Sequence, residues 1–464
     1  MNLHNLTIRE IIEGYTLHKF SSTELFAEIL GHIDQNETKI NAFITNRTTE
    51  EIFSDVTDNL IAIPIAHKDI YSTQGIETTA ASNILKGYIP PYNATSVKRL
   101  STNNFITIGK LNCDAFAHGA TGENSDFGPT LNPYDLTKTP GGSSSGSAAA
   151  VAAAFVPVAT GTDTGGSIRL PASFTNTVGI KPTYGRVSRY GVIAMTSSTD
   201  SIGHFTKTVW DNAYILSKTA GFDPLDATSS HEPVPDYLLE IDKRINGVKI
   251  GIPREYLLNI DSVILNKFNE AIDILSHLGA EIVDVSLPST EYAINAYYII
   301  TPSEVSSNLA RFDGIRYGFD RSKFGQEAKR RILIGTYCLS AGYYDAYYLK
   351  AQKVRTLIIN EFKNTFKNID VLLAPVSPIM PPNIGELTND PLKLYMMDVL
   401  TVPVNLAGIP SLSVPAGFDN NLPIGIQIIG NYFSEKLLYQ IGQAFETETQ
   451  YYKQTPKITE RNNE

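Results

Sequence analysis

The stretch that decides the fold of this chain is residues 140–185, PGGSSSGSAAAVAAAFVPVATGTDTGGSIRLPASFTNTVGIKPTYG. It holds two clusters of small residues, 141–147 and 165–167, separated by the apolar run 148–159. Glycine lets the backbone approach a ligand closely and adopt angles that other residues avoid. Two glycine–serine loops joined by a buried segment therefore indicate the two halves of one active site.

The composition of the whole chain excludes several classes of protein. The net charge of −10 on 464 residues argues against a large nucleic-acid surface on this chain itself. The only cysteines, Cys113 and Cys338, lack the spacing of a zinc or redox motif, so we expect no metal site, no disulfide and a reducing compartment. The longest apolar run is about twelve residues, too short for a membrane span. The N-terminus, MNLHNLTIREII, has no signal-peptide core.

Before residue 200 the sequence predicts helices and strands that lead into the two loops. Residues 21–33 have helical apolar spacing, and Ser21 and Glu24 form a capping box. Apolar runs predict strands at 61–66, 105–110 and 156–160, a buried helix at 147–155 and a long loop at 115–132.

The second half of the chain predicts a layered α/β fold. A strand at 247–252 is followed by a helix that Asp261 caps and Gly279 ends, and then by a strand at 281–287. This β-α-β unit predicts parallel pairing. We also expect a helix at 345–362 and strands at 371–374, 411–415 and 424–429. Residues 219–240 are the best candidate for a subdomain junction, but no repeat or long linker divides the chain, and we expect one domain over residues 1–464.

Two familiar chemistries fit the first glycine loop poorly. A phosphate-binding loop of the Walker type needs a lysine after the glycine, and the loop has none. Residues 142–146 match the G-x-S-x-G pattern of a nucleophile elbow, which requires a preceding apolar strand and a later histidine. Residues 135–139 are polar, and the last histidine of the chain is His277. A Ser-His-Asp hydrolase is therefore disfavoured.

A serine activated by a lysine is the third possibility. Lys68 ends the apolar run IAIPIAHK, and burial of a lysine disfavours its charged form, which makes it a base near neutral pH. The second loop, residues 161–167, places consecutive backbone N–H groups beside a serine, an arrangement that can bind an oxyanion. A solvated lysine and two structural turns would have the same composition, so the residues alone leave these alternatives open.

Residues 141–191, from GGSSSGS to RVSRYG, resemble the amidase signature family over its whole diagnostic length. The resemblance implies an α/β fold in which a large mixed central β-sheet is covered by helices on both faces. It also implies a signature core over about 60–210 and a C-terminal substrate-pocket portion over about 290–450. The catalytic residues that it implies are the nucleophile Ser167, the cis-serine Ser143 and the base Lys68. The oxyanion would be held by the backbone N–H groups of Thr164, Gly165, Gly166 and Ser167.

Within this family the chain is most similar to the glutamine-hydrolysing subunits of the tRNA-dependent amidotransferases, through residues 306–318, 329–358 and 400–417. That similarity implies hydrolysis of glutamine to glutamate and ammonia. The ammonia would pass to a B subunit that converts Glu-tRNA(Gln) to Gln-tRNA(Gln) with ATP and Mg, so we expect no cofactor on this chain. A small third subunit, of the C type or a fungal equivalent, would complete a heterotrimer.

The same similarity implies a glutamine pocket formed by Tyr298, Arg331 and Asp398. A guanidinium suits the α-carboxylate of a free amino acid, and a carboxylate suits its ammonium group. A solvated helical face is the other interpretation of Arg331, which lies in the run KRR.

The chain departs from the family at Ser145, Leu170 and residues 175–176, where glycine, glutamine and Cys-Gly are usual. The segment between Tyr317 and Phe324 and the one before Ile61 are shorter than in bacterial relatives. These departures favour the mitochondrial matrix over the bacterial cytoplasm. A standalone amidase acting on another small amide and a non-catalytic scaffold subunit are the alternative functions.

Overall fold

The computed structural model describes residues 2–57, 61–316, 319–388 and 390–458. Its strands are β1 Phe43–Asn46, β2 Ile63–Lys68, β3 Phe105–Leu111, β4 Val158–Asp163, β5 Val178–Lys181, β6 Ser201–Thr206, β7 Lys249–Pro253, β8 Glu281–Val285, β9 Val371–Pro375, β10 Ser411–Asp419 and β11 Leu422–Gly430. Its α-helices are α1 Ile8–Thr16, α2 Ser22–Ile40, α3 Thr49–Asp55, α4 Thr95–Ser101, α5 Ser145–Ala152, α6 Arg169–Phe174, α7 Val209–Thr219, α8 Ser262–His277, α9 Ala293–Asn308, α10 Gln326–Leu339, α11 Lys350–Thr365, α12 Pro391–Met396, α13 Val402–Ala407 and α14 Glu435–Thr449.

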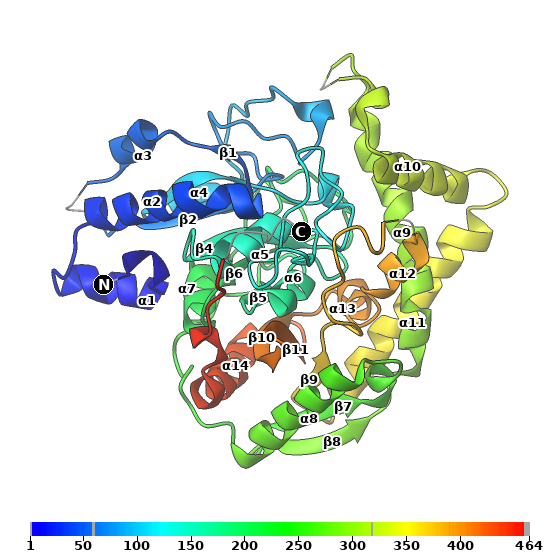
Figure 1. Ribbon diagram of the computed structural model, residues 1–464. Helices are drawn as coiled ribbons and strands as arrows, with labels where there is room; N and C mark the ends of the chain where they lie inside the picture. Colours follow the sequence, from blue (N-terminus) through cyan, green and yellow to red (C-terminus); the bar gives the residue numbers. More distant parts are fainter. Residues whose placement is uncertain (1, 58–60, 317–318, 389, 459–464) are drawn as a thin grey trace.

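The strands form one mixed sheet in the order β1-β3-β2-β4-β6-β5-β10-β11-β9-β7-β8. Helices lie on both faces of this sheet (Figure 1). The predicted α/β fold with a large mixed central sheet is therefore confirmed. Residues 219–240 connect α7 to β7, and the strands on both sides of this segment belong to the same sheet. Within the described ranges, none of the helices has the length and apolar character that a membrane crossing requires.

Most of the predicted elements are present. Ser21 and Glu24 make both hydrogen bonds of the capping box of α2, and β7 and β8 pair in parallel around α8. Asp261 occupies the N-cap position of α8, but its side chain makes no capping hydrogen bond and instead accepts one from the backbone N–H of Met380 at 3.3 Å. The predicted helix at 345–362 begins with a π-helical turn, Asp345–Leu349, before α11. The segment before Ile61 and the segment that follows Tyr317 were expected to be shorter than in bacterial relatives. Residues 58–60 and 317–318 of these segments lie outside the described residues.

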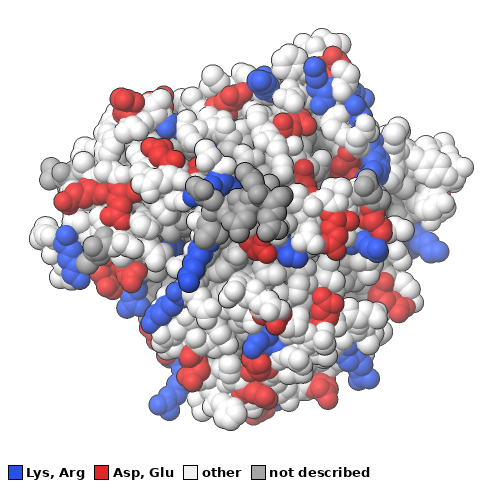
Figure 2. Space-filling view, viewed as in Figure 1, with Lys and Arg blue, Asp and Glu red and all other residues white. Residues whose placement is uncertain are grey.

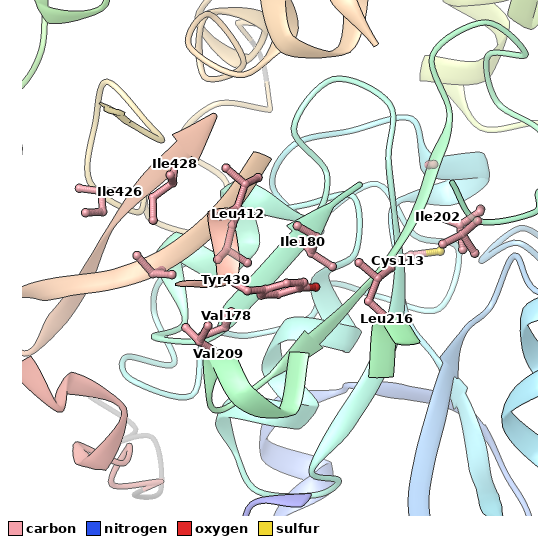
Figure 3. Close-up of a cluster of buried hydrophobic side chains, with 14 of the residues drawn as sticks. Cys113, Val178, Ile180, Ile202, Val209, Leu216, Leu412, Ile426, Ile428 and Tyr439 are labelled. Atoms are coloured by element: carbon pink, nitrogen blue, oxygen red, sulfur yellow. The ribbon is translucent and has the colours of Figure 1, made fainter. Parts of the chain in front are cut away.

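The two faces of the sheet differ in chemistry where β10 and β11 cross its middle. Successive side chains of a strand point to opposite faces. Leu412, Ile426 and Ile428 pack with Tyr439 of α14 in the largest apolar cluster (Figure 3). The intervening Gln427 faces the other side, where its Oε1 accepts a hydrogen bond of 2.9 Å from Nη1 of Arg169 in α6. The polar face is the one that carries the two glycine–serine loops.

The register of β2 and β4 places Lys68 and the second loop at one edge of the sheet. These strands are parallel neighbours, with His67 opposite Thr160, so their carboxyl ends lie side by side. β2 ends at Lys68, and β4 ends at Asp163, where the second loop begins. The carboxyl ends of parallel strands are the usual ligand-binding edge of α/β sheets.

Candidate active site

Lys68 is completely buried at the carboxyl end of β2. Its Nζ makes three hydrogen bonds to hydroxyl oxygens: Ser143 Oγ at 2.8 Å, Ser144 Oγ at 2.9 Å and Thr162 Oγ1 at 2.9 Å. Burial lowers the pKa of Lys68 to about 8, although several acidic groups nearby oppose this effect. A lysine with this pKa is partly neutral near pH 7, and its neutral amine can accept a proton from a neighbouring hydroxyl.

The first loop brings Ser143 to Lys68 through an unusual backbone. The Gly142–Ser143 peptide bond is cis, which matches the expectation of a cis-serine at Ser143. The N–H of Gly142 donates to the carbonyl oxygen of Ala120 at 2.8 Å, and the N–H of Asp114 donates to that of Ser143 at 3.1 Å. A Cβ on Gly142 would lie 2.1 Å from Oδ2 of Asp114, so only glycine fits there.

The second loop presents Ser167 next to the first. Its carbonyl oxygen accepts a hydrogen bond of 3.3 Å from the N–H of Ser144, which ties the two loops together. Ser167 is 7 % exposed, whereas Ser143 and Ser144 are completely buried. Of these serines, Ser167 is therefore the one that a substrate can reach from outside.

The carboxylate of Asp163 holds the second loop in shape. It accepts hydrogen bonds from the backbone N–H groups of Gly166, Ile168 and Arg169 at 2.9 to 3.3 Å. It also forms a buried ion pair of 3.0 Å with the guanidinium of Arg169. Although burial would raise it, this charge and the hydrogen bonds lower the pKa of Asp163 to about 2, so the carboxylate stays ionised.

The predicted oxyanion donors need one correction. The N–H of Gly166 is already bonded to Oδ1 of Asp163, because that buried carboxylate requires donors. Among the described residues, the N–H groups of Thr164, Gly165 and Ser167 have no hydrogen-bond acceptor. Thr164 is also held by its hydroxyl, which donates to Oδ1 of Asp200 at 2.7 Å. Three of the four predicted N–H groups thus remain available to an oxyanion.

Tyr298, Arg331 and Asp398 lie together although they are far apart in the sequence. The hydroxyl of Tyr298 donates to Oδ2 of Asp398 at 3.3 Å, and Cζ of Arg331 lies 5.6 Å from the centre of the Tyr298 ring. Nε of Arg331 donates to Oε1 of Glu327 at 2.8 Å. Its Nη1 is buried and has no partner within the described ranges. Arg331 therefore belongs to a buried polar cluster, and its interpretation as a solvated helical residue is wrong.

The two ionisable groups Arg331 and Asp398 of this cluster differ in how well their charged forms are stabilised. Burial would lower the pKa of Arg331, but the carboxylate of Glu327 raises it, and the guanidinium stays charged. Burial raises the pKa of Asp398 to about 7 against the opposing effect of Arg331. A cationic group next to Asp398 would therefore stabilise its ionised form.

Thr401 connects this cluster to the second loop. Its hydroxyl donates to the carbonyl oxygens of Gly165 at 2.5 Å and of Asp398 at 3.1 Å. A Cβ on Gly165 would also lie 2.6 Å from the hydroxyl of Tyr297, so the loop packs directly against α9. The cluster and the two serine loops therefore form one continuous site.

Sequence reasoning missed the groups that hold these residues in place. They are Ser144, Thr162, Asp163, Arg169, Glu327, Tyr395 and Thr401. Glu327 lies four residues before Arg331, and this helical spacing could have revealed the pair. Tyr395 stacks on Tyr298 with ring centres 3.9 Å apart, a contact between distant segments that the sequence does not reveal. In the part of the chain that the structure describes, no three His, Cys, Asp or Glu side chains group as metal ligands.

Comparison with known proteins gives consistent matches over the whole chain. A family model described as Amidase matches residues 28–439. The glutamyl-tRNA(Gln) amidotransferase A subunit of Geobacillus kaustophilus is 48% identical, and the match covers 99% of this chain and all of that protein. The crystal structure of the glutamyl-tRNA(Gln) amidotransferase A subunit from Thermotoga maritima is 41% identical, with a TM-score of 0.88 and 99% of each chain covered. The structure of a 6-aminohexanoate cyclic dimer hydrolase is 25% identical, with a TM-score of 0.89 over 98% of this chain and 99% of that one.

Proposed function

The chain belongs to the amidase signature family, and from this premise we propose that it is the glutamine-hydrolysing subunit of a glutamyl-tRNA(Gln) amidotransferase. The observation that carries the amidase chemistry is the buried contact of 2.8 Å between Nζ of Lys68 and Oγ of Ser143. The observation that supports glutamine as the amide is the cluster of Arg331 and Asp398 beside the second loop.

The reaction that this geometry supports uses the two serines and the lysine in sequence. Ser167 Oγ attacks the amide carbonyl and gives its proton to Ser143 Oγ, which passes its own proton to neutral Lys68. The developing oxyanion is held by the N–H groups of Thr164, Gly165 and Ser167. The same relay returns the proton to the leaving nitrogen, ammonia departs, and water hydrolyses the acyl-enzyme that remains on Ser167.

Glutamine fits the polar cluster through its backbone groups. The α-carboxylate would accept hydrogen bonds from Arg331, whose Nη1 is buried and unpaired within the described ranges. The α-ammonium group would lie against Asp398, and its positive charge would stabilise the ionised form of that carboxyl. Tyr298 lines the pocket between them. Binding at this end leaves the side-chain amide free to reach Ser167.

The names of the relatives support a complex as the setting of this reaction. A B subunit would receive the ammonia and convert Glu-tRNA(Gln) to Gln-tRNA(Gln), and a small third subunit would complete a heterotrimer. Neither glycine loop carries the lysine of a nucleotide-binding motif, which supports placing ATP and Mg²⁺ on the partner. On the face in Figure 2, Lys and Arg are interspersed with Asp and Glu, which favours a tRNA site carried mainly by the partner. The relatives compared above are bacterial, which favours the bacterial cytoplasm over the mitochondrial matrix.

The experiment that tests this function compares ammonia release by the chain alone and in its complex. We expect glutamine hydrolysis to be at least about tenfold faster when the B subunit and Glu-tRNA(Gln) are present, because coupling prevents loss of ammonia. Ammonia is measured enzymatically with glutamine and, as a control, with a simple aliphatic amide. Strong turnover of unrelated amides by the chain alone, without stimulation by the partner, would support the standalone amidase instead.

A further inference from the structure

His118 is a buried histidine whose ring has no hydrogen-bond partner among the residues that the structure describes. Its side chain is fully buried, and neither Nδ1 nor Nε2 makes a hydrogen bond within the described ranges. Buried polar groups in folded proteins are nearly always hydrogen-bonded. An imidazole that is buried without a partner is therefore either a costly core residue or a group that meets a ligand.

Three contacts place the loop that carries His118 beside the candidate active site. Ala120, two residues along the chain, accepts the hydrogen bond of 2.8 Å from Gly142 of the first loop. Ala120 also packs in one apolar cluster with Met397, the neighbour of Asp398. The carbonyl oxygen of His118 accepts a bond of 2.7 Å from Nδ2 of Asn124.

The contact with Asn124 extends to the helix that carries Arg331. A Cβ added to Gly325, the N-cap residue of α10, would lie 3.9 Å from Oδ1 of Asn124. Phe116 lies beside the His118 ring and packs on Phe324, which fixes the loop against the start of this helix. The loop over residues 116–124, which carries His118, therefore contacts the first glycine loop, the segment that carries Asp398 and the beginning of α10.

Arg331 is the charged group whose field acts on the His118 ring. Burial lowers the pKa of His118 well below its usual value, and the positive charge of Arg331 lowers it further. The ring is therefore neutral and carries one N–H donor. Nη1 of Arg331 is also a buried donor without an acceptor in the described part of the chain. Two such donors, one of them cationic, match an anionic group with two oxygen atoms.

We propose that His118 is a substrate-binding residue of the glutamine pocket and donates its ring N–H to the α-carboxylate that Arg331 binds. The proposal rests on the function proposed above, since it takes glutamine as the substrate. It gives the carboxylate a second donor, on a loop that also contacts the cis-serine segment.

The test is a kinetic comparison of His118→Leu and His118→Gln in the assembled complex. Losing a hydrogen bond to a charged group should raise KM for glutamine by about 10- to 100-fold, with kcat within about threefold of wild type. His118→Gln keeps an amide N–H and should recover most of the affinity. With 4-aminobutanamide, which is glutamine without its α-carboxylate, wild type and His118→Leu should have the same kcat/KM.

His204→Leu is the matched control, because His204 is also buried, and neither of its ring nitrogens has a partner in the described part of the chain, but it lies in β6 within the sheet. It should leave KM for glutamine unchanged. His118→Met, which is also apolar and more flexible, is measured beside His118→Leu so that a folding defect of one variant does not decide the result. An unchanged KM in both apolar variants, or an equal loss with glutamine and 4-aminobutanamide, would overturn the proposal. A wild-type complex that does not hydrolyse glutamine would instead contradict the proposed function itself.

Discussion

Replacing Ser167 by alanine is expected to lower glutamine-dependent amidation of Glu-tRNA(Gln) by about 10⁴-fold or more, because covalent catalysis is lost with the nucleophile. Amidation with supplied ammonium chloride should persist, since ammonia added from solution bypasses the amidase step. Both rates are measured on the same preparation of the complex by following the formation of Gln-tRNA(Gln).

Ser145→Ala is the matched control for this substitution. Ser145 is a buried serine of the first loop, but its hydroxyl contacts Thr130 at 3.2 Å and not Lys68. We therefore expect its glutamine-dependent rate to stay within about tenfold of wild type. Full glutamine-dependent activity in Ser167→Ala would refute the mechanism, and loss of both activities would indicate a scaffold role for the residue.

Replacing Lys68 by methionine is expected to lower glutamine-dependent activity by at least about 10³-fold. Methionine keeps an unbranched side chain that is one atom shorter and removes the amine that accepts the proton from Ser143. His67, the residue before Lys68, does not replace it, because successive side chains of a strand point to opposite faces. Burial also lowers the pKa of His67 to about 3, so that its ring is a weak base.

The pH dependence of the wild type tests the same role of Lys68. Its pKa is lowered to about 8, so below pH 8 the side chain is mostly protonated and cannot accept a proton. The value of kcat/KM for glutamine should therefore fall tenfold per pH unit below about pH 8 and level off above it. A profile that stays flat between pH 6 and pH 8, or activity in Lys68→Met close to that of wild type, would exclude Lys68 as the base.

The parts of the fold that sequence predicted correctly are those with strong local signals. The capping box at Ser21 and Glu24, the β-α-β unit around α8 and the late strands all have periodicity or capping residues within a few positions. The order of the eleven strands had no such signal. Their neighbours are decided by packing between distant segments, such as the pairing of β5 with β10.

The residues of the candidate site likewise fall into those with a local sequence signal and those without one. Lys68 and the two loops are marked by strand ends and by glycines that admit no side chain, as Gly142 illustrates. The role of Gly166 was predicted wrongly because nothing local shows that Asp163 would take its N–H. The stacking of Tyr395 on Tyr298 and the position of His118 depend on contacts between loops that only the folded chain brings together.

In the proposed mechanism Ser167 is the nucleophile, and Ser143 and Lys68 only relay its proton. The most direct test of this assignment is to treat the complex with a glutamine analogue that carries a diazoketone in place of the carboxamide, and to locate the covalent label by peptide mass spectrometry. We predict one label per chain, on Oγ of Ser167, and none in the Ser167→Ala variant. A label on Ser143, Ser144 or Cys113 with Ser167 unmodified would contradict the assignment.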